Sequence, residues 1–154
     1  MKDNSEEEKK RKYFELVDSN IIKHGFHITY VLEEINYTPF GYSTGLYKNF
    51  GIPEVFVSGL PNGLTNTIIT NYAKIYKDGQ IAFHQKTNDL IDRFSVYLIP
   101  VESSSLKEKV LSSYRLYDGS EFDSIQIIYP DLNGLFPEEK NYDYDMEIFG
   151  NVNK

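Results

Sequence analysis

Three parts of the chain place apolar residues at the three- and four-residue spacing that predicts an amphipathic helix. The first ends at Gly25 and starts with a capping box at Ser5–Glu8, where the serine is the expected N-cap. The second follows Pro61, and the third runs from a capping box at Ser105–Glu108 to Gly119. We therefore predict two or three helices and expect the charged start of the first one to fray.

Five other segments are rich in the aromatic and β-branched residues that favour strands. These segments are residues 26–32, 40–47, 55–60, 94–99 and 124–129. The first three follow one another through short turns, which predicts an antiparallel meander. We expect Pro100 to close the fourth strand, because proline has no backbone N–H to donate. The fifth becomes wholly apolar before its end and is expected near the sheet centre.

The helices and strands do not alternate strictly, which favours an α+β fold. We predict a single domain with one mainly antiparallel sheet of about five strands, packed with two or three helices. A barrel-like closure of the sheet stays open at this point. The expected divisions are a charged N-terminal helix at residues 1–24, the α+β domain at 25–138, and an acidic C-terminal tail at 139–154.

The negative charge of the chain is concentrated near its C-terminus. The 154 residues hold 16 Lys and Arg against 23 Asp and Glu, a net charge of −7. Residues 118–147 hold nine of these acids and a single lysine. Such a block repels phosphate backbones and attracts basic surfaces, so we expect a basic protein partner and no nucleic acid. The partner-binding candidates are Asp131, Glu138, Glu139, Asp143 and Asp145.

Several function classes lack their residues in this sequence. There is no cysteine, which excludes disulfides and Cys-ligated metals. No apolar run is long enough for a membrane span, and the N-terminus lacks the apolar core of a secretory signal. His24 and His27 lie on either side of Gly25, so they need not face one another. We predict a cytoplasmic protein with no metal, no cofactor and no membrane partner, and a homodimer stays open.

One short motif and one isolated acid are candidates for chemistry. Gly41–Gly45 spells G-x-S-x-G, but a turn and a strand are expected after it, whereas a hydrolase serine precedes a helix. We therefore predict no catalytic residue. Glu54 precedes an apolar strand and either caps a turn through backbone N–H groups or lines a pocket. The ligand-binding candidates are His27, Tyr42, Ser43 and Glu54.

A series of motifs resembles the bacterial domain-of-unknown-function family 4262. The motifs are His24-Gly25-Phe26-His27, Thr38 to Leu46, Phe50 to Glu54, Ser58-Gly59-Leu60, Gln126 to Asp131, Gly134 and Phe136-Pro137. Three positions depart from the usual family pattern. Ser43 stands where the family has threonine, Ile52 where it has histidine, and Glu138 where it has tryptophan. The resemblance implies a bacterial cytosolic domain and no particular activity.

Two functions are compatible with these features. The first is a non-catalytic binding protein, for example an immunity, antitoxin or defence-associated factor that binds a basic protein. The second is an enzyme that binds a small ligand or a flavin in a pocket near Tyr42, Ser43 and Glu54. The flavin alternative rests on a similarity of layout to split-barrel flavin-binding proteins, and fold layout does not determine function.

Overall fold

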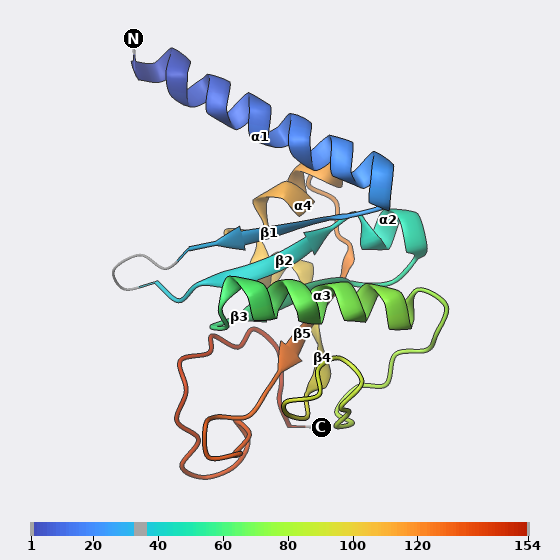
Figure 1. Cartoon of the computed structure of the whole chain (residues 1–154), viewed down its shortest axis with the longest axis vertical. Coiled ribbons are helices and arrows are strands. Elements are labelled where there is room, and N and C mark those ends of the chain that lie inside the picture. Colours follow the sequence, from blue (N-terminus) through green and yellow to red (C-terminus); the bar gives the residue numbers. More distant parts are fainter. Residues whose placement is uncertain (1, 33–36, 154) are drawn as a thin grey trace.

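The computed structural model describes residues 2–32 and 37–153, except for the side chains of residues 2–4. Within this part of the chain, four α-helices and one 3-10 helix accompany five strands (Figure 1). The elements are α1 (Lys2–His24), β1 (His27–Val31), β2 (Phe40–Thr44), α2 (Leu46–Phe50), β3 (Glu54–Ser58), α3 (Asn62–Tyr76), β4 (Tyr97–Glu102), η1 (Ser103–Leu106), α4 (Leu111–Leu116) and β5 (Asp123–Ile128). None of the described helices is long and apolar enough to cross a membrane.

The five strands form one mixed sheet in the order β1-β2-β3-β5-β4. β1, β2 and β3 make the predicted antiparallel meander, β4 is antiparallel to β5, and β3 and β5 are parallel. The predicted α+β class with one mainly antiparallel sheet is confirmed. The sheet stays open, with β1 and β4 as its edges, so the barrel-like alternative is wrong. Each face of the sheet packs its own hydrophobic cluster, which leaves no single interior for a barrel to enclose.

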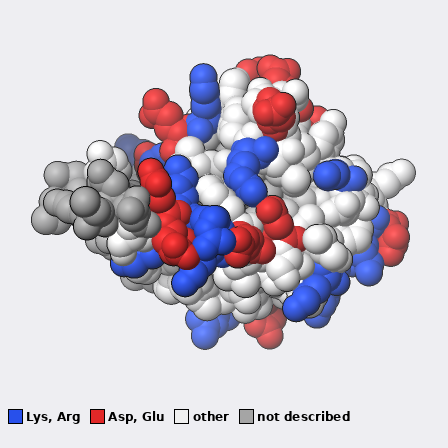
Figure 2. Space-filling model, turned by 90° about the horizontal axis from the view of Figure 1, so that it is seen from above, with Lys and Arg blue, Asp and Glu red and all other residues white. Residues whose placement is uncertain are grey.

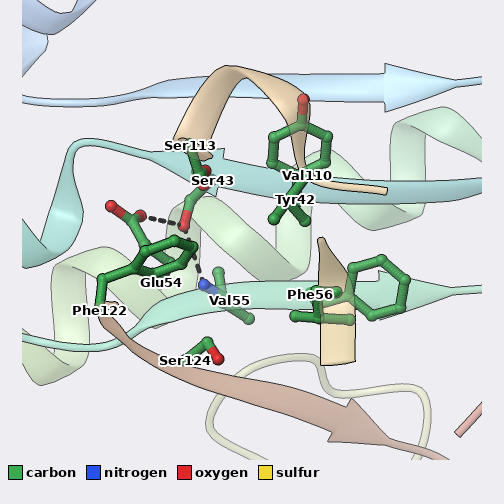
Figure 3. A pocket seen from close by; sticks show the side chains of 10 residues that line it. Tyr42, Ser43, Glu54, Val55, Phe56, Val110, Ser113, Phe122 and Ser124 are labelled. Atoms are coloured by element: carbon green, nitrogen blue, oxygen red, sulfur yellow. Dashed lines mark hydrogen bonds between the residues drawn. The ribbon is translucent and has the colours of Figure 1, made fainter. Parts of the chain in front are cut away.

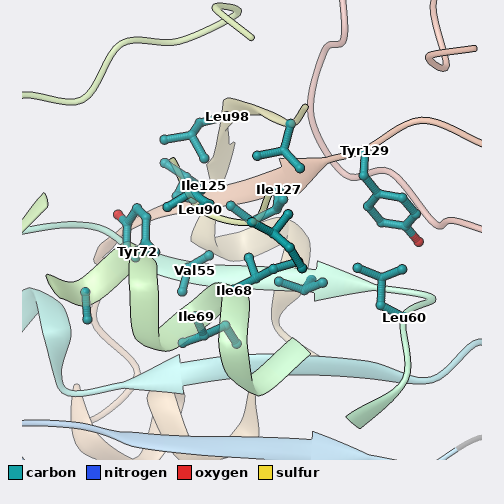
Figure 4. Close-up of a cluster of buried hydrophobic side chains, with 14 of the residues drawn as sticks. Val55, Leu60, Ile68, Ile69, Tyr72, Leu90, Leu98, Ile125, Ile127 and Tyr129 are labelled. Atoms are coloured by element: carbon teal, nitrogen blue, oxygen red, sulfur yellow. The ribbon is translucent and has the colours of Figure 1, made fainter. Parts of the chain in front are cut away.

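The two hydrophobic clusters follow from the alternation of side chains along the strands. On one face, α3 packs against the meander, and its buried residues meet apolar side chains of β3 and β5 (Figure 4). Gly41 of β2 allows this contact, because a Cβ atom there would lie 2.4 Å from the Thr65 methyl group of α3. On the other face, Phe40, Tyr42 and Phe56 pack with residues of η1 and the segment before α4.

α1 is joined to the body by its second half, while its first turns extend beyond the sheet in Figure 1. Val17 is fully buried, and Arg115 of α4 forms a two-pronged ion pair with Asp18. The helix ends at Gly25 as predicted, with φ at 89°. It begins earlier than predicted, because Ser5 lies inside the helix and no glycine or proline interrupts residues 2–5. Met1, the first residue of the expected N-terminal division, lies outside the described residues.

Three further predicted boundaries are wrong. The second strand ends at Thr44, because Gly45 adopts a left-handed conformation and α2 begins at once. β4 continues past Pro100, which an edge strand tolerates because one row of its backbone groups has no ladder partner. The third helix is divided into η1 and α4, and Ser105 lies within η1 instead of capping a longer helix.

Residues 139–153, the described part of the expected acidic tail, form no helix or strand and lie along the domain. The Glu147 backbone N–H donates to Ser58 Oγ at 3.0 Å, and Gln126 on β5 bonds the backbone of both Glu147 and Phe149. Gly59 makes room for the segment, because a Cβ atom there would lie 2.5 Å from the Asp145 carbonyl oxygen. The backbone of this segment is therefore fixed against the domain, and its acidic side chains project from that fixed backbone.

Candidate functional site

Ser43 and Glu54 lie together at the ends of β2 and β3, as the pocket hypothesis required (Figure 3). The Ser43 hydroxyl donates to Glu54 Oε1 at 2.7 Å and accepts the Val55 backbone N–H at 2.9 Å. Ser113 of α4 donates to the Ser43 carbonyl oxygen at 2.9 Å. We call Ser43, Glu54, Ser113 and Tyr117 the Glu54 cluster. It joins two strands of the sheet to the helix that covers them.

The Glu54 carboxylate is the centre of this cluster, although its side chain is only 3% exposed. It accepts the backbone N–H groups of Gly45, Leu46 and Tyr47, at 2.8, 3.2 and 3.3 Å, at the start of α2. The Tyr117 hydroxyl donates to Glu54 Oε2 as well. A helix start offers unpaired N–H groups and a partial positive charge, which a carboxylate satisfies. Of the two sequence-based alternatives, the capping role of Glu54 is the one observed.

The Glu54 cluster has little room for a ligand in this structure. The space between its side chains and those of Val110 and Phe122 is too small for a water molecule. Burial, followed by the negative charge of Glu54, raises the pKa of Tyr117 well above its ordinary value, so this tyrosine stays protonated and donates its hydrogen bond. Every buried side-chain nitrogen and oxygen atom in the described residues has a hydrogen-bond partner. A ligand would therefore have to displace existing bonds.

Of the other two ligand-binding candidates, Tyr42 lines the same small space as Ser43 and Glu54, and His27 does not. The Tyr42 hydroxyl accepts the Ser112 backbone N–H at 3.1 Å, which ties β2 to α4. His27 on β1 lies between α1 side chains: its Nδ1 is 2.9 Å from Asn20 Nδ2, and its Nε2 is 3.3 Å from the Tyr13 hydroxyl. Burial lowers the pKa of His27 below its ordinary value, which favours the neutral ring. These contacts give His27 a role in attaching α1.

The five partner-binding candidates have different environments. Asp131 is buried and accepts the backbone N–H groups of Asn133, Leu135 and Asp143, each at 2.9 Å. Desolvation tends to raise the pKa of Asp131, but these backbone hydrogen bonds outweigh it and hold the pKa below its ordinary value. Asp131 therefore organises the backbone of the loop that follows β5.

The other four candidates, Glu138, Glu139, Asp143 and Asp145, are exposed. Glu138 accepts the Tyr97 hydroxyl at 2.5 Å, and Asp145 accepts the Thr38 hydroxyl at 3.0 Å. Glu139, Asp143 and Asp145 belong to the docked C-terminal segment, and Glu138 directly precedes it. We call the three of them that lie furthest along the chain, Glu139, Asp143 and Asp145, the loop acids. They present carboxylates at one end of the sheet, beyond the C-terminal end of β5.

A groove of about 940 Å³ lies at the opposite end of the sheet, and we call it the sheet-end groove. Its lining comes from the last residues of β4, the first residues of β5, Pro53, Tyr47 and Phe83. Three exposed acids, Glu102, Glu121 and Asp123, contribute to it. β5 thus separates the acids of residues 118–147 into two groups, one at the start of the strand and one, the loop acids, beyond its end. A six-residue strand is roughly 20 Å long, so the two groups of acids lie well apart.

Glu102 and Asp123 are directly opposite one another on β4 and β5. Directly opposed residues point to the same side of a sheet with Cβ atoms about 5 Å apart, and like charges in this position destabilise the pair. Among the described residues, neither carboxylate has an ion pair or a side-chain hydrogen bond. This repulsion has no evident structural benefit.

Sequence reasoning missed several residues of both sites. Ser113 of α4 and Tyr117, which directly follows α4, reach the Glu54 cluster from about 60 to 70 positions further along the chain, and no local pattern connected them with Glu54. Glu102 and Asp123 were not predicted to meet, because the β4–β5 register cannot be read from composition. The described part of the chain contains no group of three or more His, Asp or Glu residues placed to hold a metal ion.

Comparison with known proteins agrees with the resemblance seen in the sequence. No curated protein and no solved structure matches the chain. A family model described as a domain of unknown function (DUF4262) matches residues 20–143. The match begins within α1 and extends past β5, so it includes the Glu54 cluster and both ends of the sheet. The chain belongs to the DUF4262 family of domains of unknown function.

Proposed function

We propose that this protein is a non-catalytic binding protein that engages a basic protein partner through the loop acids Glu139, Asp143 and Asp145. The observation that carries the proposal is the docking of the C-terminal segment, which holds these carboxylates exposed on a fixed backbone. Preorganised charges of one sign accelerate association with a surface of opposite charge and help to select it. An immunity, antitoxin or defence role would use such a surface.

The distribution of charge over the molecule supports the choice of these acids. Figure 2 shows the side that carries α1, where Lys and Arg side chains alternate with Asp and Glu. On α1, Arg11 pairs with both Glu8 and Glu15 at 2.6 Å, which neutralises part of this surface. The loop acids have a single neighbouring base in the sequence, Lys140. A basic partner is therefore attracted to the C-terminal segment more than to α1.

The closed state of the Glu54 cluster supports a role without catalysis. General acid or base chemistry needs a group within hydrogen-bond reach of a bound substrate. Ser43 and Glu54 instead bond to one another and to the backbone around α2. These hydrogen bonds give Ser43 and Glu54 a role in stabilising the fold, which needs no catalytic function.

A capture experiment with two matched variants tests this proposal. The protein is immobilised and exposed to an extract of the cells that produce it, and bound proteins are identified by mass spectrometry. The loop variant Glu139→Gln/Asp143→Asn/Asp145→Asn removes three charges, and the control Glu6→Gln/Glu7→Gln/Glu8→Gln removes three charges from α1.

We expect one basic protein to bind the wild type and the control, and to be reduced at least tenfold with the loop variant. Capture that is equal for both variants would contradict the proposal, as would the absence of a basic protein among the specific partners. Repeating the capture at higher salt adds a second check, because exposed charge pairs weaken as ionic strength rises.

A further inference from the structure

His27 belongs to β1, but both nitrogen atoms of its ring contact side chains of α1. The Asn20 amide nitrogen donates to Nδ1 at 2.9 Å, so Nδ1 carries no hydrogen and Nε2 carries the single hydrogen of the neutral ring. Nε2 lies 3.3 Å from the Tyr13 hydroxyl, which is also 2.7 Å from Thr29 Oγ1. His27 is only 9% exposed. The histidine therefore links the helix to the sheet in its neutral form.

α1 has few other contacts with the body of the protein. Val17 is the only fully buried side chain among the described side chains of the helix, and residues 5–12 are all exposed. Arg115 of α4 pairs with Asp18, and its guanidinium carbon lies 4.4 Å from the centre of the Phe14 ring. The family match begins only at residue 20, so most of α1 precedes the matched domain. Because the docking of so exposed a helix depends on a small contact area, the bonds of His27 are a large part of its attachment.

The strands around His27 offer no charge to balance a second proton on its ring. β1 and β2 contain no Asp, Glu, Lys or Arg, and the direct partner of His27 in the sheet is Thr44. Two tyrosines lie on this side of the strands. Burial raises the pKa of Tyr13, which therefore stays uncharged, and the Tyr42 hydroxyl accepts the Ser112 backbone N–H.

The two helices packed on this side offer no unpaired acid either. The second half of α1 has two acids, Glu15 and Asp18, which pair with Arg11 and Arg115. The remaining titratable side chains of this half of α1 and of α4 are not acids that pair with a histidine: Lys23, His24 and Tyr114. Burial is accordingly the cause that lowers the pKa of His27 below its ordinary value of 6.5.

We propose that protonation of His27 releases α1 from the sheet, so that α1 is a pH-controlled arm of the domain. The second proton goes to Nδ1, where it faces the N–H donors of the Asn20 amide. Turning this amide restores one hydrogen bond but supplies no negative charge, and a buried cation without a counter-charge is unfavourable. Undocking of α1 exposes the ring to water, which hydrates the imidazolium. The release does not depend on the identity of any partner.

The direction of the pH dependence follows from the lowered pKa of His27 in the docked state. Docking is at full strength above pH 6.5, weakens as the pH falls below that value, and stops changing below the pKa of the docked state. Each unit of difference between the two pKa values corresponds to about tenfold weaker docking of the protonated protein. The coupling is reciprocal, so a substitution that weakens docking raises the pKa of His27 toward 6.5.

NMR of the full-length protein between about pH 7.5 and about pH 5.5 tests both directions of this coupling. Arg115→Gln removes the ion pair with Asp18 and weakens docking without changing the surroundings of the His27 ring, while Asp18 keeps its charge in this range. We expect the His27 ring to titrate below pH 6.5 in the wild type and closer to 6.5 in Arg115→Gln. His84, beside the opposite edge strand, is the control and should respond to pH identically in both proteins.

The methyl signals of Val17 report the docking itself, because this side chain is fully buried only while α1 is docked. In Arg115→Gln, the undocked fraction should rise at least threefold between about pH 7.5 and about pH 5.5. The double variant Arg115→Gln/His27→Gln keeps a donor and an acceptor at the β1 position but does not titrate, so its Val17 signals should not change over this range.

Three results would overturn the inference. Val17 signals that stay constant while His27 titrates would show that the docked state accommodates the imidazolium. An equal His27 pKa in the wild type and Arg115→Gln would show that docking and protonation are not coupled. A pH response of Val17 that persists after His27→Gln would assign the release to another group.

Discussion

Two groups of carboxylates at the same end of the sheet have opposite environments. Glu54 at the start of β3 points toward α4 and receives hydrogen bonds from Ser43, Tyr117 and three backbone N–H groups. Asp123, which precedes the β5 partner of Glu54, points to the other face and meets Glu102. One carboxylate is enclosed by donors, and the others lie beside an open groove.

The difference between the two groups comes from what covers each face. α2 and α4 enclose Glu54, so removal of water is compensated by hydrogen bonds to the charged form. No described segment covers the corner occupied by Glu102 and Asp123, and these acids remain in water. The same side-chain chemistry therefore stabilises the fold in one place and is available for recognition in the other. Four substitutions test this comparison.

The largest effect is expected for Glu54→Ala. It leaves the N–H groups of Gly45, Leu46 and Tyr47 buried without their acceptor, together with the Ser43 and Tyr117 hydroxyls. Unsatisfied buried donors cost about 1–3 kcal/mol each, although the losses are not fully additive, so we expect a loss of roughly 3–5 kcal/mol. Urea unfolding of both proteins measures it. Glu54→Gln is the matched variant and should lose less, since one amide oxygen remains; equal stability of Glu54→Ala and wild type would refute the capping role.

The next largest effect is expected for Asp131→Asn. Asp131 resembles Glu54, and differs from Glu102 and Asp123, because its carboxylate accepts backbone N–H groups. The amide keeps one acceptor oxygen, but its NH₂ group faces the N–H of Asp143 or Leu135. Because the pKa of Asp131 is lowered in the folded state, its stabilising contribution is present above pH 3.8 and is lost as the pH falls through the lowered value.

Unfolding curves at a series of pH values check this prediction for Asp131. The stability difference between wild type and Asp131→Asn should be largest near neutral pH and should shrink below pH 3.8. The exposed Asp143→Asn variant serves as the control. A difference that stays constant down to pH 2 would mean that the Asp131 charge contributes nothing to folding.

A smaller loss is expected for Tyr117→Phe, which removes one donor to Glu54 and the acceptor of the Lys48 N–H. A hydrogen bond to a charged group contributes about 1.5–3 kcal/mol, and we expect a loss of about 2 kcal/mol. Tyr47→Phe is the control, because the Tyr47 hydroxyl has no hydrogen bond among the described residues. Thermal unfolding should separate the two variants, and identical melting temperatures would show that Tyr117 adds nothing to the cluster.

The smallest effect has the opposite sign. Asp123→Asn removes the repulsion with Glu102, and we expect a gain of about 0.2–1 kcal/mol. The gain should disappear at high salt, because exposed charges are screened. Glu139→Gln, an exposed acid with no opposed partner in the sheet, should show no such gain. A loss of stability in Asp123→Asn at low salt would mean that this acid has a structural partner and that the comparison is wrong.

The sequence predicted the strands better than it predicted the contacts among them. Local patterns identified the meander, the stop of α1 at Gly25 and the strand at 124–129, because these depend on side-chain periodicity and on glycine conformation. They also identified Glu54 as a residue without a packing role. The patterns failed where long-range packing overrides local preference. The capping box at Ser105–Glu108 did not start a helix, and the end of the second predicted strand became α2.

The sequence by itself determined the fold class, the family and the excess of acidic residues near the C-terminus, because composition, periodicity and motif order are properties of the chain. Only the tertiary structure decided which acids are enclosed and which are available. The β4–β5 register opposes Glu102 to Asp123, and α4 brings Tyr117 to Glu54 across 63 positions. Pairing of strands and docking of helices depend on the summed packing of many distant residues, so no local pattern encodes these contacts.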